Sequence, residues 1–169
     1  SPSVANARRG KAAPWTIRTQ DMKVAIITGA SAGIGSATAR AFQSEGFAVY
    51  NLARRACPVQ GVTNLACDLS NETAIASACA TLEQVVAGCS EVALVHNASQ
   101  MLKDKANACV SDKLRQVMAT NVIAVNSLNQ RLLPLLPRTS SVLYVGSTLA
   151  EKAVPGAFSY IVSKHAQLG

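Results

Sequence analysis

Short apolar runs alternate with helical stretches along this chain of 169 residues, and this alternation limits the fold more than any other feature. The first run, KVAIIT, is continuously apolar after its lysine, as expected of a strand buried on both faces. Strands alternating with helices predict an α/β fold, here a doubly wound parallel sheet of the Rossmann type. The strands are predicted over residues 23–28, 47–52, 62–67, 91–96 and 141–147.

Helices are expected in the intervening segments. Gly46 should end the first helix, and Asn71 is a suitable N-cap for the second. In open parallel sheets, ligands bind beyond the carboxyl ends of the strands. The helices are predicted from the glycine-rich turn to Glu45, over residues 71–87, from Ser111 to Leu136, and from Ala157 onward.

The composition is that of a globular protein, with 49% hydrophobic and 15% charged residues. No apolar run reaches the roughly 18 residues that a membrane-spanning helix needs, so we expect a soluble, cytoplasmic protein with no membrane partner. The five cysteines are odd in number and form no C-x-x-C pair or Cys/His cluster. We therefore expect reduced thiols, some of them in the core, and no metal site.

The net charge of +7 is concentrated near the amino end, because the first twenty residues hold four basic side chains and no acid. Residues 1–21 are predicted to form a basic flexible extension, and residues 22–169 the dinucleotide-binding domain. A transit peptide remains an alternative, as does upstream sequence preceding a start at Met22. Nucleic-acid binding is disfavoured, since no basic stripe with interleaved aromatic residues follows.

The glycine-rich stretch TGASAGIG, residues 28–35, lies directly between the first strand and the first helix. Gly29, Gly33 and Gly35 would let the backbone approach a pyrophosphate, with Ser31 and Ile34 in the same turn. A tight turn without a ligand is the structural alternative. The position between a strand and a helix favours a nucleotide site.

Several later motifs occur in an order and spacing that resemble those of the short-chain dehydrogenase/reductase family. The glycine spacing Gly-x-x-x-Gly-x-Gly fits that family, and HNAS at residues 96–99 is similar to its Asn-Asn-Ala-Gly motif. Asn121, Ser147 and the Tyr160-x-x-x-Lys164 pair match the family's catalytic residues. The resemblance covers about residues 22–169 and implies an oxidoreductase.

The chemistry of carbonyl reduction explains this set of side chains. A tyrosine hydroxyl has an ordinary pKa of about 10, and a nearby ammonium group favours the phenolate. Residues four apart share a helix face, so Lys164 can lie beside Tyr160. The resemblance implies that Tyr160 is the general acid/base, Lys164 assists it and holds the ribose, and Ser147 orients the carbonyl. It also implies that Asn121 positions a water that relays protons to Lys164.

The end of the second predicted strand indicates the cofactor. NAD-binding folds place an acid there to hold the ribose 2′-hydroxyl, whereas this chain has Ala53 followed by Arg54 and Arg55. Because arginine suits a 2′-phosphate, we predict NADP (NADPH) rather than NAD, with two solvated loop arginines as the alternative. The resemblance implies further cofactor contacts from Asp68 and Leu69 at the adenine and from Asn97, Ala98 and Ser99 near the nicotinamide, although Asp68 can also serve a nearby helix cap.

Departures from the family pattern carry their own expectations. His96 is expected to be a hydrogen-bonded residue at the end of its strand, and Ser99 lacks the conformational freedom of the family's glycine. Family members continue through two more strands and a substrate loop, so the domain is expected to be incomplete, with the edge of strand 141–147 uncovered.

The function predicted from the sequence is hydride transfer between nicotinamide and a small carbonyl or alcohol substrate, by a homo-oligomer (dimer or tetramer). A non-catalytic nucleotide-binding protein, or an inactive fragment of such an enzyme, is the alternative.

Overall fold

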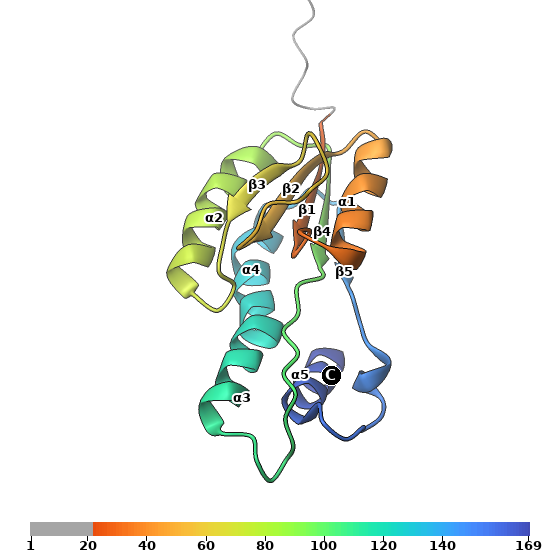
Figure 1. Cartoon of the computed structure of the whole chain (residues 1–169). Helices are drawn as coiled ribbons and strands as arrows, with labels where there is room; N and C mark the ends of the chain where they lie inside the picture. The colour runs from red at the N-terminus through yellow and green to blue at the C-terminus, as the bar shows by residue number, and fades with distance from the viewer. Residues whose placement is uncertain (1–21) are drawn as a thin grey trace, which may run out of the picture.

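The computed structural model describes residues 22–169, so the predicted extension 1–21 lies outside the described residues. Five parallel strands form one sheet in the order β3-β2-β1-β4-β5 (Figure 1). This arrangement confirms the predicted doubly wound parallel sheet. The strands are β1 (Lys23–Thr28), β2 (Ala48–Ala53), β3 (Thr63–Ala66), β4 (Glu91–His96) and β5 (Ser141–Tyr144).

Helices cover both faces of the sheet, with α1 on one face and α2 and α4 on the other (Figure 1). Alternate residues of β1 enter the two cores: Val24 and Ile26 pack with Leu82 and Leu128, whereas Ile27 packs on the α1 side. Two covered faces explain why β1 is buried at every position after its first and apolar from Val24 to Ile27. The main helices are α1 (Gly33–Ser44), α2 (Glu72–Val86), α3 (Ser111–Met118), α4 (Ala124–Leu132) and α5 (Phe158–Leu168).

The expected helix boundaries hold at two of the named residues. Gly46 follows the end of α1 with a φ of 81°, and the Asn71 side chain accepts a hydrogen bond from the Ala74 backbone N–H at the start of α2. All five cysteines are free thiols, and Cys57, Cys67 and Cys79 are buried. No helix among residues 22–169 is long and apolar enough to cross a bilayer.

The predicted helical region from Ser111 to Leu136 is confirmed to within one residue, but it is not α-helical throughout. A π-helical turn, η2 (Ala119–Ile123), separates α3 from α4, and a short 3-10 turn, η3 (Leu133–Leu135), follows α4. The π turn carries Asn121, whose side chain bonds to the backbone of residue 100 and to Ser163. These contacts are tertiary, so helical periodicity along the sequence contains no sign of them.

The predicted strand 141–147 was too long, because β5 ends at Tyr144. The Val145 N–H still bonds to the His96 carbonyl at 2.9 Å, and the chain then leaves the sheet. Ser147 therefore does not close the strand but precedes a 3-10 turn, η4 (Thr148–Ala150). β5 is an edge strand, and Leu143 and Tyr144 on it are 43% and 49% exposed, as expected for an uncovered edge.

The predicted strands 23–28 and 91–96 are confirmed as β1 and β4. The other two predictions differ by one residue at each end: β2 begins and ends one residue later than predicted, and β3 spans only residues 63–66. More important for function is the strand order, which places β1 between β2 and β4. The segments that follow these strands therefore meet at one edge of the sheet, the lower edge in Figure 1, with α3 and α5 beyond it.

Candidate active site

The turn after β1 is shaped by its glycines. Gly29 has a φ of 71°, and a Cβ there would lie 3.0 Å from the Ala98 backbone. A Cβ on Gly35 would lie 2.4 Å from the Gly29 carbonyl oxygen and 2.5 Å from the Asn97 amide nitrogen. Gly33 differs, because its φ is 54° but a Cβ would meet nothing within 4 Å. Two glycines thus allow close packing inside the turn, and the third faces open space.

The start of α1 can accept an anion. Its N-cap, Ala32, offers no side-chain hydrogen bond, and its first turn contains no acidic residue. The first N–H groups of this helix therefore lack a side-chain partner within the chain, and the positive end of the helix dipole is not neutralised. Ser31 beside this turn lines the cavity described below, whereas Ile34 points outward with 65% of its surface exposed.

The β1 and β4 ends are joined by Thr28 and Asn97. The Thr28 hydroxyl accepts hydrogen bonds from the backbone N–H groups of Asn97 and Ala98, each at 3.0 Å. In return the Asn97 side-chain NH2 donates to the carbonyls of Thr28 and Gly29. Asn97 therefore fixes the glycine turn. Ser99 follows without a positive φ, so the chain leaves β4 along a path open to any residue.

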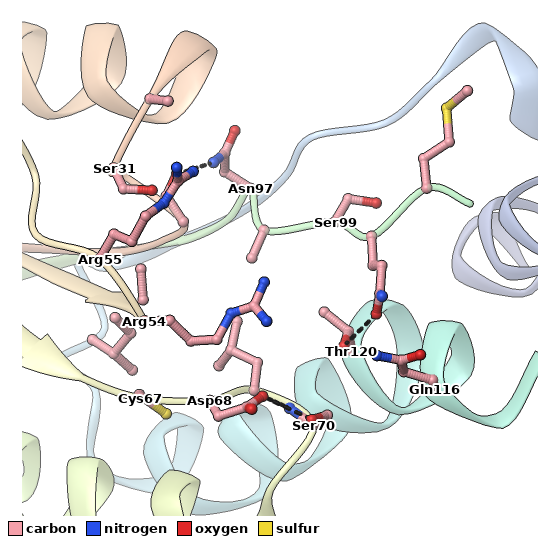
Figure 2. A pocket seen from close by; sticks show the side chains of 18 residues that line it. Ser31, Arg54, Arg55, Cys67, Asp68, Ser70, Asn97, Ser99, Gln116 and Thr120 are labelled. Carbon is pink, nitrogen blue, oxygen red and sulfur yellow. Dashed lines mark hydrogen bonds between the residues drawn. The ribbon is translucent and has the colours of Figure 1, made fainter. Parts of the chain in front are cut away.

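The end of β2 presents the two arginines. Asn51, fully buried in β2, accepts a hydrogen bond from the Ala30 N–H at 2.9 Å and donates to the Arg55 carbonyl at 3.1 Å. This one side chain ties the arginine loop to the glycine turn. Figure 2 shows Arg55 extending toward Ser31, while Arg54 extends into the space in front of Asp68. Ala53 supplies no acid at the strand end.

Asp68 and Leu69 follow β3 at the same edge. The Asp68 carboxylate accepts hydrogen bonds from the Ser70 hydroxyl and N–H, and these bonds lower the pKa of Asp68, with Arg54 adding a smaller effect. The N-cap of α2 is Asn71, so Asp68 does not serve as the cap of that helix. Leu69 is buried at the base of this segment.

A cavity of about 480 Å³ lies among these segments (Figure 2). Four strand ends contribute to its walls, together with the α3–η2 region through Gln116 and Thr120. Among residues 22–169 no cluster of acidic, histidine or cysteine side chains could hold a metal ion. The predicted cofactor residues in the wall are Gly29, Ser31, Arg54, Arg55, Asp68, Leu69, Asn97, Ala98 and Ser99; Gly33, Ile34, Gly35, Tyr160 and Lys164 lie outside it.

The predicted catalytic residues come together around α5. The Lys164 Nζ lies 5.7 Å from the centre of the Tyr160 ring, and it donates to the Val145 carbonyl at 3.0 Å. Lys164 is only 3% exposed, and this burial lowers its pKa. Ser147 is the N-cap of η4, which packs against α5, and its hydroxyl accepts a hydrogen bond from the Leu149 N–H. Tyr160 itself is half-buried.

Asn121 holds α5 in position through its side chain. Its amide group exchanges two hydrogen bonds with the Gln100 backbone, at 2.7 and 2.9 Å, and donates to the Ser163 hydroxyl at 2.8 Å. The Ser163 hydroxyl in turn donates to the Tyr160 carbonyl. Both N–H donors of the Asn121 side chain are therefore used within the protein.

Two histidines lie outside this site. His96 is buried at the end of β4, where its Nε2 pairs with the Asn129 amide oxygen at 2.8 Å and its ring stacks on Tyr144. This confirms the expectation that His96 is a hydrogen-bonded residue at the end of its strand. Burial also lowers the pKa of His96. His165 is exposed and pairs with the Ile161 carbonyl of its own helix.

Sequence reasoning missed three supporting residues. Thr28 lay within the quoted glycine motif but was not given a role. Asn51, a polar residue in the middle of an apolar strand, was a signal that could have been used. Asp104 gave no signal, because it supports α5 from a loop 55 residues away: its Oδ1 accepts from the Ser159 N–H at 3.0 Å.

Comparison with known proteins agrees with this geometry. Residues 23–169 match the family model described as short chain dehydrogenase. The "Short chain aldehyde dehydrogenase 1" of Euphorbia lathyris is 27% identical over 91% of this chain and 58% of its own length. The ligand-free aldohexose dehydrogenase of Thermoplasma acidophilum superposes with a TM-score of 0.79 at 25% identity, covering 89% of this chain and 59% of that one. A 4-hydroxyisoleucine dehydrogenase complexed with NADH and succinate gives 0.77 at 22% identity, covering 86% and 69%, a likeness of fold alone.

The chain belongs to the short-chain dehydrogenase/reductase family, whose members are oxidoreductases that use NAD or NADP. It spans between 53% and 65% of the length of the curated relatives that it matches.

Proposed function

We propose that this chain forms the cofactor-binding and catalytic part of an NADP-dependent oxidoreductase acting on a carbonyl or alcohol substrate. The observation that carries the proposal is the cavity at the carboxyl edge of the sheet, which lies beside the Tyr160–Lys164 helix and is lined by both arginines after β2. Its walls offer an anion-binding turn, a basic group and an apolar residue, which suit pyrophosphate, 2′-phosphate and adenine respectively.

The NADP preference rests on Arg54. Its side chain extends into the cavity close to Asp68, and the strand end lacks the acid that would hold a free 2′-hydroxyl. Arg55 lines the Ser31 side of the same cavity and extends in a different direction from Arg54. NAD carries no 2′-phosphate with which an arginine could pair.

The bound nicotinamide would supply or accept the hydride. In reduction, Tyr160 would donate its hydroxyl proton to the carbonyl oxygen, and the resulting phenolate would be stabilised by the Lys164 ammonium group. Ser147 would hold the substrate oxygen by a hydrogen bond. Asn121 would act indirectly, by fixing Gln100 and Ser163 and so the position of α5.

A cytoplasmic homo-oligomer acting on a small molecule remains our expectation for the whole protein. The alternative is a nucleotide-binding protein without turnover. A panel of small ketones and aldehydes, assayed by NADPH oxidation, separates the two: turnover abolished by Tyr160→Phe supports the enzyme, and cofactor binding with no turnover in any substrate supports the alternative.

The decisive experiment is a fluorescence titration of the chain with NADPH and NADH, repeated on Arg54→Ala. Loss of one charge-assisted hydrogen-bonding partner should weaken NADPH binding about tenfold and leave NADH binding unchanged. Arg40→Ala is the matched control, since Arg40 is an exposed residue of α1 that does not line the cavity. Equal loss for both cofactors would refute the phosphate role of Arg54, and binding of neither by the parent chain would refute the proposal.

A further inference from the structure

The side-chain amide of Gln167 lies between Lys164 and the backbone of Asn121. Its Oε1 accepts a hydrogen bond from the Lys164 Nζ at 2.8 Å, and its Nε2 donates to the Asn121 carbonyl at 3.4 Å. Gln167 is half-buried and lies three residues after Lys164 on α5. We propose that Gln167 is a positioning residue that holds the Lys164 ammonium group, in the place that the family resemblance assigns to a water.

The number of donors on the ammonium group explains what this contact does. A lysine ammonium has three N–H donors. One is used by the Val145 carbonyl and a second by Gln167, so a single donor remains for a ligand. Because Lys164 is almost fully buried, these two acceptors determine the direction in which that donor points. The catalytic meaning of this arrangement rests on the proposed function, whereas the contact itself does not.

An amide in this position differs chemically from a water. A water molecule can reverse its hydrogen bonds and pass a proton along, but the amide Oε1 only accepts and the Nε2 only donates. Gln167 therefore stabilises the charged form of Lys164 without connecting it to a proton path at Asn121. The proton that Tyr160 transfers must consequently be exchanged by a route that does not cross this gap.

Lys164 has no oppositely charged partner among the described residues near α5. Within residues 22–169, Lys164 takes part in no ion pair, and its remaining hydrogen-bond partner is a backbone carbonyl. Tyr160 lies on the same helix, with the centre of its ring 5.7 Å from the Lys164 Nζ. None of the charged residues near α5 forms an ion pair or a hydrogen bond with Lys164; these are Asp112, Lys113 and Arg115 of α3, Asp104 beside the amino end of α5, and Glu151 after η4.

The test follows Lys164 directly, by NMR titration of 13C,15N-labelled lysine side chains from pH 7 to 11 in the absence of cofactor. Lys164→Arg identifies the signal. Removal of one acceptor in Gln167→Leu should lower the titration midpoint by about one pH unit, and Gln167→Glu should raise it by introducing a carboxylate. Leu168→Ala is the matched control, because Leu168 is the 67%-exposed next residue of the same helix and should leave the midpoint unchanged.

An unchanged midpoint in Gln167→Leu overturns the proposal, and so does an equal shift in Leu168→Ala, which would indicate a general loosening of the helix end. Circular dichroism and thermal melts establish that each variant is folded, and Gln167→Glu provides a second, opposite shift should Gln167→Leu unfold. Since no cofactor is present, failure of NADPH binding would refute the proposed function and leave this result standing.

Discussion

At the scale of single residues, the site depends on polar side chains that make several hydrogen bonds each. The Thr28 hydroxyl accepts hydrogen bonds from two backbone N–H groups that follow β4. The Asn97 side chain donates two hydrogen bonds to carbonyls at the start of the glycine turn. These contacts leave no space for a methyl group at Gly35, whose Cβ would lie against the Gly29 carbonyl oxygen and the Asn97 amide nitrogen. The shape of the turn is therefore determined by contacts made within the protein, before any ligand binds.

Gly35→Ala tests this rigidity. The added methyl group would lie 2.4 Å from a backbone oxygen, which a rigid strand end cannot move, so we expect a loss of about 1–3 kcal/mol in the free energy of unfolding and at least tenfold weaker cofactor binding. Urea denaturation and NADPH titration measure the two effects. Gly46→Ala is the control, because Gly46 has a φ of 81° and open space around it, so only backbone strain of about 1 kcal/mol applies, with cofactor affinity retained. Equal behaviour of the two variants would contradict the steric argument.

At the scale of helices and strands, the elements predicted correctly are those that show in the pattern of consecutive residues. Both faces of β1 are covered, so four consecutive residues, Val24 to Ile27, are apolar and the strand is easy to place. The π turn at Asn121 escaped prediction because its partners, Gln100 and Ser163, are distant in sequence. The early end of β5 was also missed, because after the Val145 N–H bond to His96 the chain leaves the sheet and enters the turn η4.

The amino end of α5 illustrates a distant contact that can be tested. Its N-cap residue, Ala157, offers no side-chain hydrogen bond, and Asp104 from the β4–α3 loop supplies one instead, to the Ser159 N–H. Asp104→Ala should therefore lower the free energy of unfolding by about 1–2 kcal/mol at pH 7 and expose the Tyr160 region to hydrogen exchange. Asp104→Asn keeps the acceptor oxygen and should cost less. If both variants were as stable as the parent chain, Asp104 would not be supporting α5.

The same contact should depend on pH in a definite direction. Burial acts to raise the pKa of Asp104, but the hydrogen bonds from Ser159 and Cys109 outweigh it and hold the pKa below its usual value. The pKa of Asp104 is therefore lower in the folded protein than the value of about 3.9 in the unfolded chain. The stabilisation is fully present at a pH above the unfolded-state pKa, and it is lost as the pH falls through the folded-state pKa. The difference in unfolding free energy between the parent chain and Asp104→Ala should therefore shrink below about pH 4. A constant difference from pH 7 to pH 3 would show that the charge is not involved.

At the scale of the whole molecule, the site exists because β1 lies between β2 and β4. Segments that follow four different strands, centred on residues 31, 54, 68 and 98, border a single cavity although nearly seventy residues separate the first from the last. No one segment could bind a dinucleotide alone. A ligand in this cavity must therefore order all four together, a property that belongs to the topology and not to any motif.

Hydrogen–deuterium exchange measures this coupling. At saturating NADPH we expect slower exchange in all four segments at once, with the outer turns of α2 unchanged because they lie away from the cavity. Total stability should rise by about 2.7 kcal/mol at a hundredfold excess over the dissociation constant. In Arg54→Ala the four segments should lose protection together at a fixed NADPH concentration, because occupancy falls. Protection confined to the glycine turn would mean that the ligand binds there as a simple anion, and the reading of the cavity as one dinucleotide site would then be wrong.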